Sequence, residues 1–158
     1  MFKKTTWDTV TDGNILTLHP VLRPKATFFI NYWEAQEVYI RIYCGFRSEE
    51  WQNDLYAQGR TKPGKVVTQA KAWQSYHNYG LAFDCVEIRK GQALWINPRW
   101  PDIAESGKTF GLEWGGNFIK KDKPHFQLTY GIHHSKMHQM VLSDKMKGGF
   151  INIDTYLV

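Results

Sequence analysis

Residues 75–88 read Ser-Tyr-His-Asn-Tyr-Gly-Leu-Ala-Phe-Asp-Cys-Val-Glu-Ile, a turn-like segment followed by an apolar one. The apolar part, Leu81–Ile88, predicts a buried strand whose side chains alternate between two faces. Phe83 and Cys85 would share one face, and Asp84 would point from the other. A carboxylate buried in an apolar strand is costly unless a cation or hydrogen bonds compensate it. Asp84 therefore needs a partner, and an arginine, a helix N-terminus or a metal ion would each serve.

The segments on both sides of this strand predict helices mixed with short strands. Helical spacing, N-cap residues and Gly or Pro breakers mark the helices, and alternating β-branched and aromatic residues mark the strands. We expect helices over residues 25–37, 48–59, 101–110 and 133–146, further strands over residues 38–44 and 125–129, and an exposed basic loop over residues 60–71. This mixture predicts an α+β domain with a small, mostly antiparallel sheet flanked by helices.

The composition fits one globular domain spanning residues 1–158. Of these residues 42% are hydrophobic and 22% are charged, which suits a folded core and excludes a disordered chain. No run approaches the ~20 apolar residues of a membrane-spanning helix. No apolar stretch follows Lys3-Lys4, so we expect no signal peptide and a cytoplasmic start. Cys44 and Cys85 are too few for a disulfide framework and are interpreted as buried thiols.

The chain is basic and rich in aromatic residues. Twenty Lys and Arg against fifteen Asp and Glu give a net charge of +5, and 15% of the residues are aromatic. This balance favours a polyanionic partner, which could be nucleic acid, anionic lipid or a carboxylate-rich cell wall. No nucleic-acid-binding motif accompanies the charge.

Two histidines and one further acid are placed to join Asp84 in a metal site. His77 precedes Asp84 by seven residues across a glycine, and His125 begins another predicted strand. Two imidazoles and one carboxylate form a common catalytic zinc set that leaves a fourth position for water. Asp122, three residues before His125, could act as a general base beside that water. The alternatives are satisfied core histidines and a solvated acid among lysines.

Several short motifs occur in a fixed order along residues 38–128. They are Gly45-Phe46-Arg47-Ser48, Leu55-Tyr56-Ala57-Gln58-Gly59-Arg60-Thr61, Pro63-Gly64, Val67-Thr68, Ser75-x-His77-Asn78-Tyr79-Gly80-Leu81-Ala82-x-Asp84, Gly111-Leu112-x-Trp114-Gly115-Gly116 and Asp122-x-Pro124-His125-Phe126. Together they resemble the D-Ala-D-Ala carboxypeptidase/VanY-like zinc peptidases. Within that group they are most similar to the L-alanyl-D-glutamate endopeptidases, found among bacteriophage endolysins and bacterial cell-wall hydrolases.

The resemblance implies a zinc cofactor on the sheet and a role for each polar residue of the motifs. It implies that His77, Asp84 and His125 are the zinc ligands and that Asp122 is the catalytic base. Arg47 would steady the substrate carbonyl with a fixed fork of donors. An Arg47 salt bridge to a nearby glutamate is the alternative that the sequence leaves open.

The remaining residues fit the resemblance to different degrees. Ser75 belongs to the motif and would support the site by hydrogen bonding. Residues 72–74 differ from the pattern, which has a glycine before that serine. Trp114 is a candidate substrate platform, with core packing as the alternative. Residues 130–158 match no known pattern and have no assigned role.

The function implied is a monomeric zinc endopeptidase that cuts the peptidoglycan stem between L-Ala and D-Glu, as a bacteriophage endolysin held in the host cytoplasm until a membrane pore releases it to the cell wall. A D,D-carboxypeptidase acting on D-Ala-D-Ala ends is one alternative, and a non-catalytic wall-binding module with a structural zinc, or a basic nucleic-acid binder, is another.

Seven cationic residues flank the expected site in the sequence, and we call them the basic collar: Arg60, Lys62, Lys65, Lys71, Lys120, Lys121 and Lys123. We expect the collar to attract the anionic wall, with a merely solvated surface as the alternative.

Overall fold

An antiparallel sheet built around one long strand organises the computed structural model, which describes residues 3–156. The sheet has the order β1–β2–β5–β4, and β3 pairs with the far end of β2. The strands are β1 (Ile40–Cys44), β2 (Ala82–Arg89), β3 (Gln92–Ala93), β4 (Glu113–Trp114) and β5 (His125–Gln127). The predicted α+β class with an antiparallel sheet is therefore confirmed.

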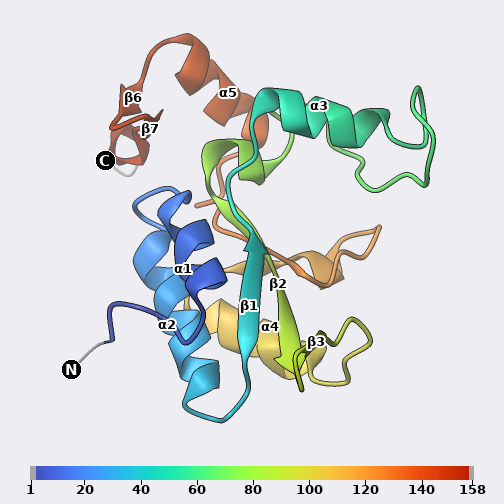
Figure 1. Ribbon diagram of the computed structural model, residues 1–158. Helices are drawn as coiled ribbons and strands as arrows, with labels where there is room; N and C mark the ends of the chain where they lie inside the picture. Colours follow the sequence, from blue (N-terminus) through green and yellow to red (C-terminus); the bar gives the residue numbers. More distant parts are fainter. Residues whose placement is uncertain (1–2, 157–158) are drawn as a thin grey trace.

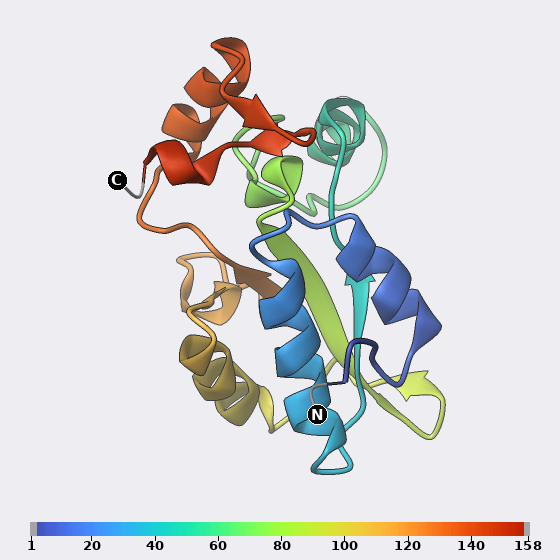
Figure 2. The same ribbon diagram turned by 90° about the vertical axis from the view of Figure 1, so that its left-hand side faces the viewer.

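Three helices cover one face of this sheet (Figures 1 and 2). They are α1 (Thr9–Leu16), α2 (Arg23–Glu34) and α4 (Trp100–Thr109). Phe83 and Cys85 of β2 and Phe126 of β5 point into the main hydrophobic core, where Phe29 of α2 and Ile103 of α4 meet them. Because side chains alternate along a strand, Asp84 and His125 are left on the opposite face, as the sequence predicts for Asp84.

Two further short elements lie near the start of β2, and the first of them matches the helix predicted over residues 48–59. Helix α3 (Glu49–Ala57) begins where Ser48 accepts a hydrogen bond from the backbone N–H of Trp51, an N-cap. A 3₁₀ turn, η1 (Tyr76–Tyr79), leads directly into β2. Among the residues described, no helix combines the length and apolar character that a bilayer crossing requires.

The C-terminal segment forms a second layer over η1 (Figure 2). It contains α5 (His134–Leu142), the hairpin of β6 (Met146–Lys147) and β7 (Phe150–Ile151), and η3 (Ile153–Thr155). A second hydrophobic cluster joins Met137 and Ile151 of this segment to Tyr79 and Leu81. The Tyr79 hydroxyl also donates to the carbonyl oxygen of His134 at 3.0 Å. The segment therefore braces the turn that precedes β2.

The structure corrects two of the sequence expectations about helices. The helix expected over residues 133–146 ends at Leu142, because Asp144 takes a positive φ of 54° and residues 146–151 form a hairpin. Helix α1 was not expected at all. Its N-cap, Asp8, accepts from the Thr11 backbone and also pairs with Arg41 of β1 through two hydrogen bonds of 2.8 and 2.9 Å. That long-range pair has no signature in the local sequence.

Candidate active site

The three residues predicted as metal ligands lie together at the start of β2. Asp84 and His125 are direct cross-strand partners, and His77 comes from η1, just before the strand. Oδ1 of Asp84 is 3.2 Å from Nε2 of His77 and 3.2 Å from Nδ1 of His125. All three side chains are buried. Gly80 makes this possible: its φ is +68°, and a Cβ there would lie 2.7 Å from the backbone nitrogen of His19.

Each imidazole lies between two oxygen acceptors. This arrangement shows whether the residues fit a metal ion. Nδ1 of His77 is 2.7 Å from the Gly45 carbonyl oxygen, and Nε2 of His125 is 2.8 Å from Oε1 of Gln127; the second nitrogen of each ring faces Asp84. A neutral imidazole has only one N–H and can satisfy only one of two acceptors. A cation between Asp84 and the two remaining nitrogens would satisfy the rest. The donor set therefore fits a zinc ion.

The electrostatics of the cluster are consistent with a cation site. Burial opposes ionisation of Asp84, but the adjacent imidazoles of His77 and His125 outweigh it and hold the pKa of Asp84 well below its usual value. Burial lowers the pKa of His77, which disfavours a second proton on that ring. Burial also acts against the charged form of His125, but the contact with Asp84 raises its pKa.

Asp122 lies beside this cluster on the loop between β4 and β5. One oxygen of Asp122, one of Asp84 and one ring nitrogen of His125 all lie within 4.8 Å of one another. Burial, reinforced by the charge of Asp84, raises the pKa of Asp122. Gly115 permits the approach, since a Cβ at Gly115 would lie 2.4 Å from the Asp122 carbonyl oxygen. The arrangement gives a carboxylate that can accept a proton at the edge of the metal site.

Arg47 forms a buried ion pair with the other oxygen of Asp84. Its Nη2 donates to Oδ2 of Asp84 at 2.6 Å, its Nε to Sγ of Cys44 at 3.3 Å, and its Nη1 to Oε1 of Gln52 at 3.4 Å. A guanidinium has five N–H donors, so donors remain that can reach a substrate. Neither Glu49 nor Glu50 pairs with Arg47 in the part of the chain described, which leaves that alternative without support.

The turn that carries His77 is held by side chains of its own segment. Ser75 is the N-cap of η1, and its hydroxyl accepts from the His77 backbone N–H at 3.3 Å. The amide of Asn78 donates to the carbonyl oxygens of Arg47 and Ser48 at 3.0 and 3.3 Å. Asn78 thereby joins η1 to the segment of Arg47, a role that the sequence did not suggest.

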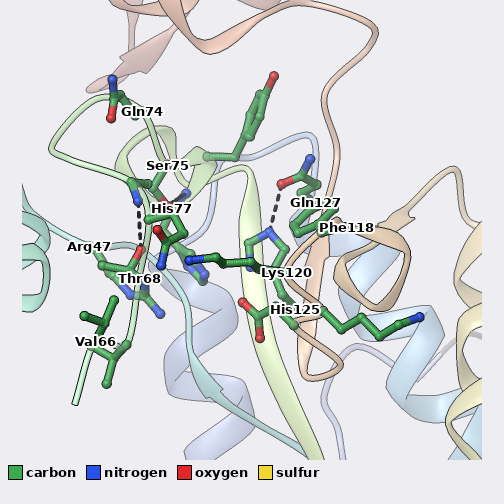
Figure 3. Close-up of a pocket in the computed structure, with 16 residues that line it drawn as sticks. Arg47, Val66, Thr68, Gln74, Ser75, His77, Phe118, Lys120, His125 and Gln127 are labelled. Atoms are coloured by element: carbon green, nitrogen blue, oxygen red, sulfur yellow. Dashed lines mark hydrogen bonds between the residues drawn. The ribbon is translucent and has the colours of Figure 1, made fainter.

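A cavity of about 490 Å³ opens above the cluster. Val66, Thr68 and Arg47 lie along one wall, and Phe118 and Gln127 along the other (Figure 3). His77, His125 and Asp122 also line it, while Asp84 is buried and is not among the lining residues.

The wall formed by residues 66–70 is tied to helix α3 by a buried glutamine. Nε2 of Gln52 donates to the Ala70 carbonyl oxygen at 2.8 Å, while Oε1 of the same side chain accepts from Arg47. Gln52 therefore fixes the position of one cavity wall relative to the guanidinium. Sequence reasoning missed Gln52, because a single polar residue in a helix carries no distinguishing signal.

Trp114 is not among the residues that line this cavity, and its contacts favour core packing, the alternative to a substrate platform. Its indole packs against the main core, and its Nε1 donates to the Lys123 carbonyl oxygen at 2.6 Å. A Cβ at Gly116 would lie 2.2 Å from the indole ring, so the glycine makes room for it. Trp114 braces the loop that carries Asp122.

Comparisons with known proteins place this chain in a peptidase family. A family model described as D-alanyl-D-alanine carboxypeptidase matches residues 68–128, which include His77, Asp84, Asp122 and His125. The chain is 37% identical over 122 residues to the peptidoglycan L-alanyl-D-glutamate endopeptidase CwlK of Bacillus subtilis (strain 168). That alignment covers 70% of this chain and 73% of the relative.

Solved structures share the fold. The L-Ala D-Glu endopeptidase ChiX of Serratia marcescens matches with a TM-score of 0.54 and 24% identity, over 81% of this chain and 92% of that one. The vancomycin resistance D,D-pentapeptidase VanY, solved in complex with Zn(II), matches with a TM-score of 0.55 and 16% identity, over 89% of this chain and 84% of that one.

Proposed function

We propose that this chain, which belongs to the M15 family of zinc peptidases, hydrolyses the bond between L-Ala and D-Glu in the peptidoglycan stem. The relative CwlK, which carries that activity in its name, supports the choice of bond. The single observation that carries the proposal is the pair of imidazoles around Asp84, each with an acceptor behind it, at the base of an open cavity.

In this proposal His77, Asp84 and His125 hold the zinc ion. A zinc ion bound there would act as a Lewis acid and lower the pKa of an attacking water towards ~7. Asp122 accepts the proton of that water and returns it to the departing amine. Arg47 keeps Asp84 in place and directs its remaining donors at the substrate carbonyl, where charge develops in the transition state. Ser75 holds the turn that presents His77.

The digestion product distinguishes this function from its alternatives. Purified peptidoglycan treated with the enzyme should gain a new N-terminal D-Glu, and a chelator should stop the reaction. Release of free D-Ala instead would identify a D,D-carboxypeptidase. A protein that binds the wall and releases neither product would be the wall-binding module with a structural zinc, and cleavage that persists after zinc removal would exclude the metal from the mechanism.

Lys120 is positioned to bind a negatively charged group on the leaving residue. Its side chain extends across the cavity from the Phe118 wall (Figure 3), and its ammonium has no hydrogen bond or ion pair within residues 3–156. The D-Glu of the stem is linked through its γ-carboxyl, so its free α-carboxylate lies next to the scissile nitrogen. Of the basic collar, Lys120 and Lys121 line the cavity, and the ammonium of Lys121 already donates to the Gly116 carbonyl oxygen. We propose that Lys120 binds this carboxylate.

Lys120→Met is therefore expected to lower kcat/KM about tenfold on a stem peptide with D-Glu, and to change it little on one with D-isoglutamine. Lys65→Met, at a collar residue that does not line the cavity, should behave as the wild type on both peptides. Equal losses on the two peptides would contradict carboxylate recognition.

A rate on whole walls that is the same at low and high salt would contradict attraction by the collar.

We also propose that the enzyme is a bacteriophage endolysin that acts as a monomer on the wall. The motifs shared with wall hydrolases of this kind and the net charge of +5 support this proposal. Expression in the host should cause lysis only together with a membrane pore. Lysis without the pore would contradict it.

A further inference from the structure

Strand β5 carries a row of polar side chains that extends beyond the metal cluster. His125 and Gln127 point to the same face, and Thr129 continues their alternation just past the strand, while Phe126 and Leu128 pack into the core. Glu113 of β4 is the cross-strand partner of Gln127. Neither Glu113 nor Gln127 belongs to the ligands or the catalytic residues proposed above.

These side chains form one continuous chain of hydrogen bonds. Nε2 of His125 lies 2.8 Å from Oε1 of Gln127, and Nε2 of Gln127 donates to Oε2 of Glu113 at 3.2 Å. The other oxygen of Glu113, Oε1, accepts from the hydroxyl of Thr129. That hydroxyl in turn accepts from the backbone N–H of Gly131 at 3.1 Å, which directs its proton to Glu113.

The chemistry of the groups determines which one donates and which one accepts at each of these hydrogen bonds. A carboxylate is only an acceptor, so the Gln127 amide must turn its NH₂ to Glu113 and its oxygen to His125. The oxygen is also only an acceptor, so the proton of the His125 ring belongs on Nε2. Nδ1, which faces Asp84 at 3.2 Å, is then left with its lone pair. In the same way, the Gly45 backbone carbonyl places the proton of the His77 ring on Nδ1 and leaves Nε2 unprotonated.

We propose that Gln127 and Glu113 are positioning residues that select Nδ1 of His125 as the metal-binding nitrogen. The inference rests on the proposed metal site and adds to it the part that the side chains of β4 and β5 supply. Hydrogen bonds behind a ligating histidine fix its tautomer and ring orientation, and losing one commonly weakens metal binding 10–100-fold.

The test is zinc affinity, measured on the full-length protein by competition with a chromophoric chelator. Gln127→Leu is expected to weaken zinc binding about 10–100-fold. The exchanged pair Glu113→Gln with Gln127→Glu reverses donor and acceptor across the strands and still presents an oxygen to His125. It should bind zinc within about threefold of the wild type. Gln92→Leu, on the exposed strand β3, serves as the control and should change nothing.

A second readout follows the histidine itself. In zinc-loaded, ¹⁵N-labelled protein, the His125 Nε2–H should be protected from exchange in the wild type and in the exchanged pair, and exposed in Gln127→Leu. Wild-type zinc affinity in Gln127→Leu would overturn the inference. So would a folded exchanged pair that binds zinc as weakly as Gln127→Leu, because packing alone would then explain the loss. A His125→Ala protein that still binds zinc like the wild type would instead overturn the metal site, and this inference with it.

Discussion

Asp122→Asn is expected to lower the turnover of purified peptidoglycan by ~10²–10⁴-fold while zinc content stays at the wild-type level. The side chain lies within 4.8 Å of potential ligand atoms of Asp84 and His125, but it is on the cavity side and exposed as a residue. Burial of its carboxyl raises the pKa of Asp122, which suits a group that must take and return a proton. Asparagine keeps the shape of the side chain and cannot take the proton.

The measurement pairs kcat with metal content by elemental analysis. Asp144→Asn is a matched control: Asp144 is exposed and takes a left-handed φ of 54°, which asparagine tolerates. Full turnover by the Asp122 variant would contradict the role of base. Loss of zinc together with turnover would show that Asp122 binds the metal instead.

The sequence led to the right strand and the right face of it, because both follow from local chemistry. An acid in an otherwise apolar strand requires a partner wherever the strand lies, and Asp84 was identified on that ground alone. The sequence left an arginine, a helix N-terminus and a metal as alternatives. In the structure an arginine and a metal are compatible, because Oδ2 of Asp84 pairs with Arg47 and Oδ1 faces the two imidazoles.

What the sequence could not supply is pairing between distant segments. The alternation His-Phe-Gln-Leu-Thr over residues 125–129 does mark a polar face, but nothing local indicates that Glu113 lies opposite Gln127. The same holds for residues 130–156, which match no motif. Their place over η1 depends on the packing of Met137 and Ile151 against Tyr79 and Leu81, which lie 56 to 72 residues earlier in the chain.

Asp84→Asn should remove two functions of one carboxylate, which are zinc binding and the pairing with Arg47. Measuring the two losses separately is the sharpest test of the site. The variant is expected to lose zinc binding and activity. In the presence of chelator, it should also be less stable to unfolding by about 3–5 kcal/mol, because Arg47 keeps its charge in a buried position without its partner. Asp54→Asn is the control. Its pair with Lys62 is exposed, so less than about 1 kcal/mol is expected.

The double variant Arg47→Met with Asp84→Leu separates the two losses. Removing both charges together leaves no buried ion unpaired, and apolar replacement of a buried pair is often neutral for stability. The double variant should therefore regain most of the stability in urea unfolding with chelator present, and still bind no zinc. If Asp84→Asn alone were as stable as the wild type, the buried pair with Arg47 would not hold this carboxylate. If the double variant bound zinc, Asp84 would not be a ligand, and Asp122 or Cys44, which also lie within reach of this cluster, would have to complete the site with the histidines.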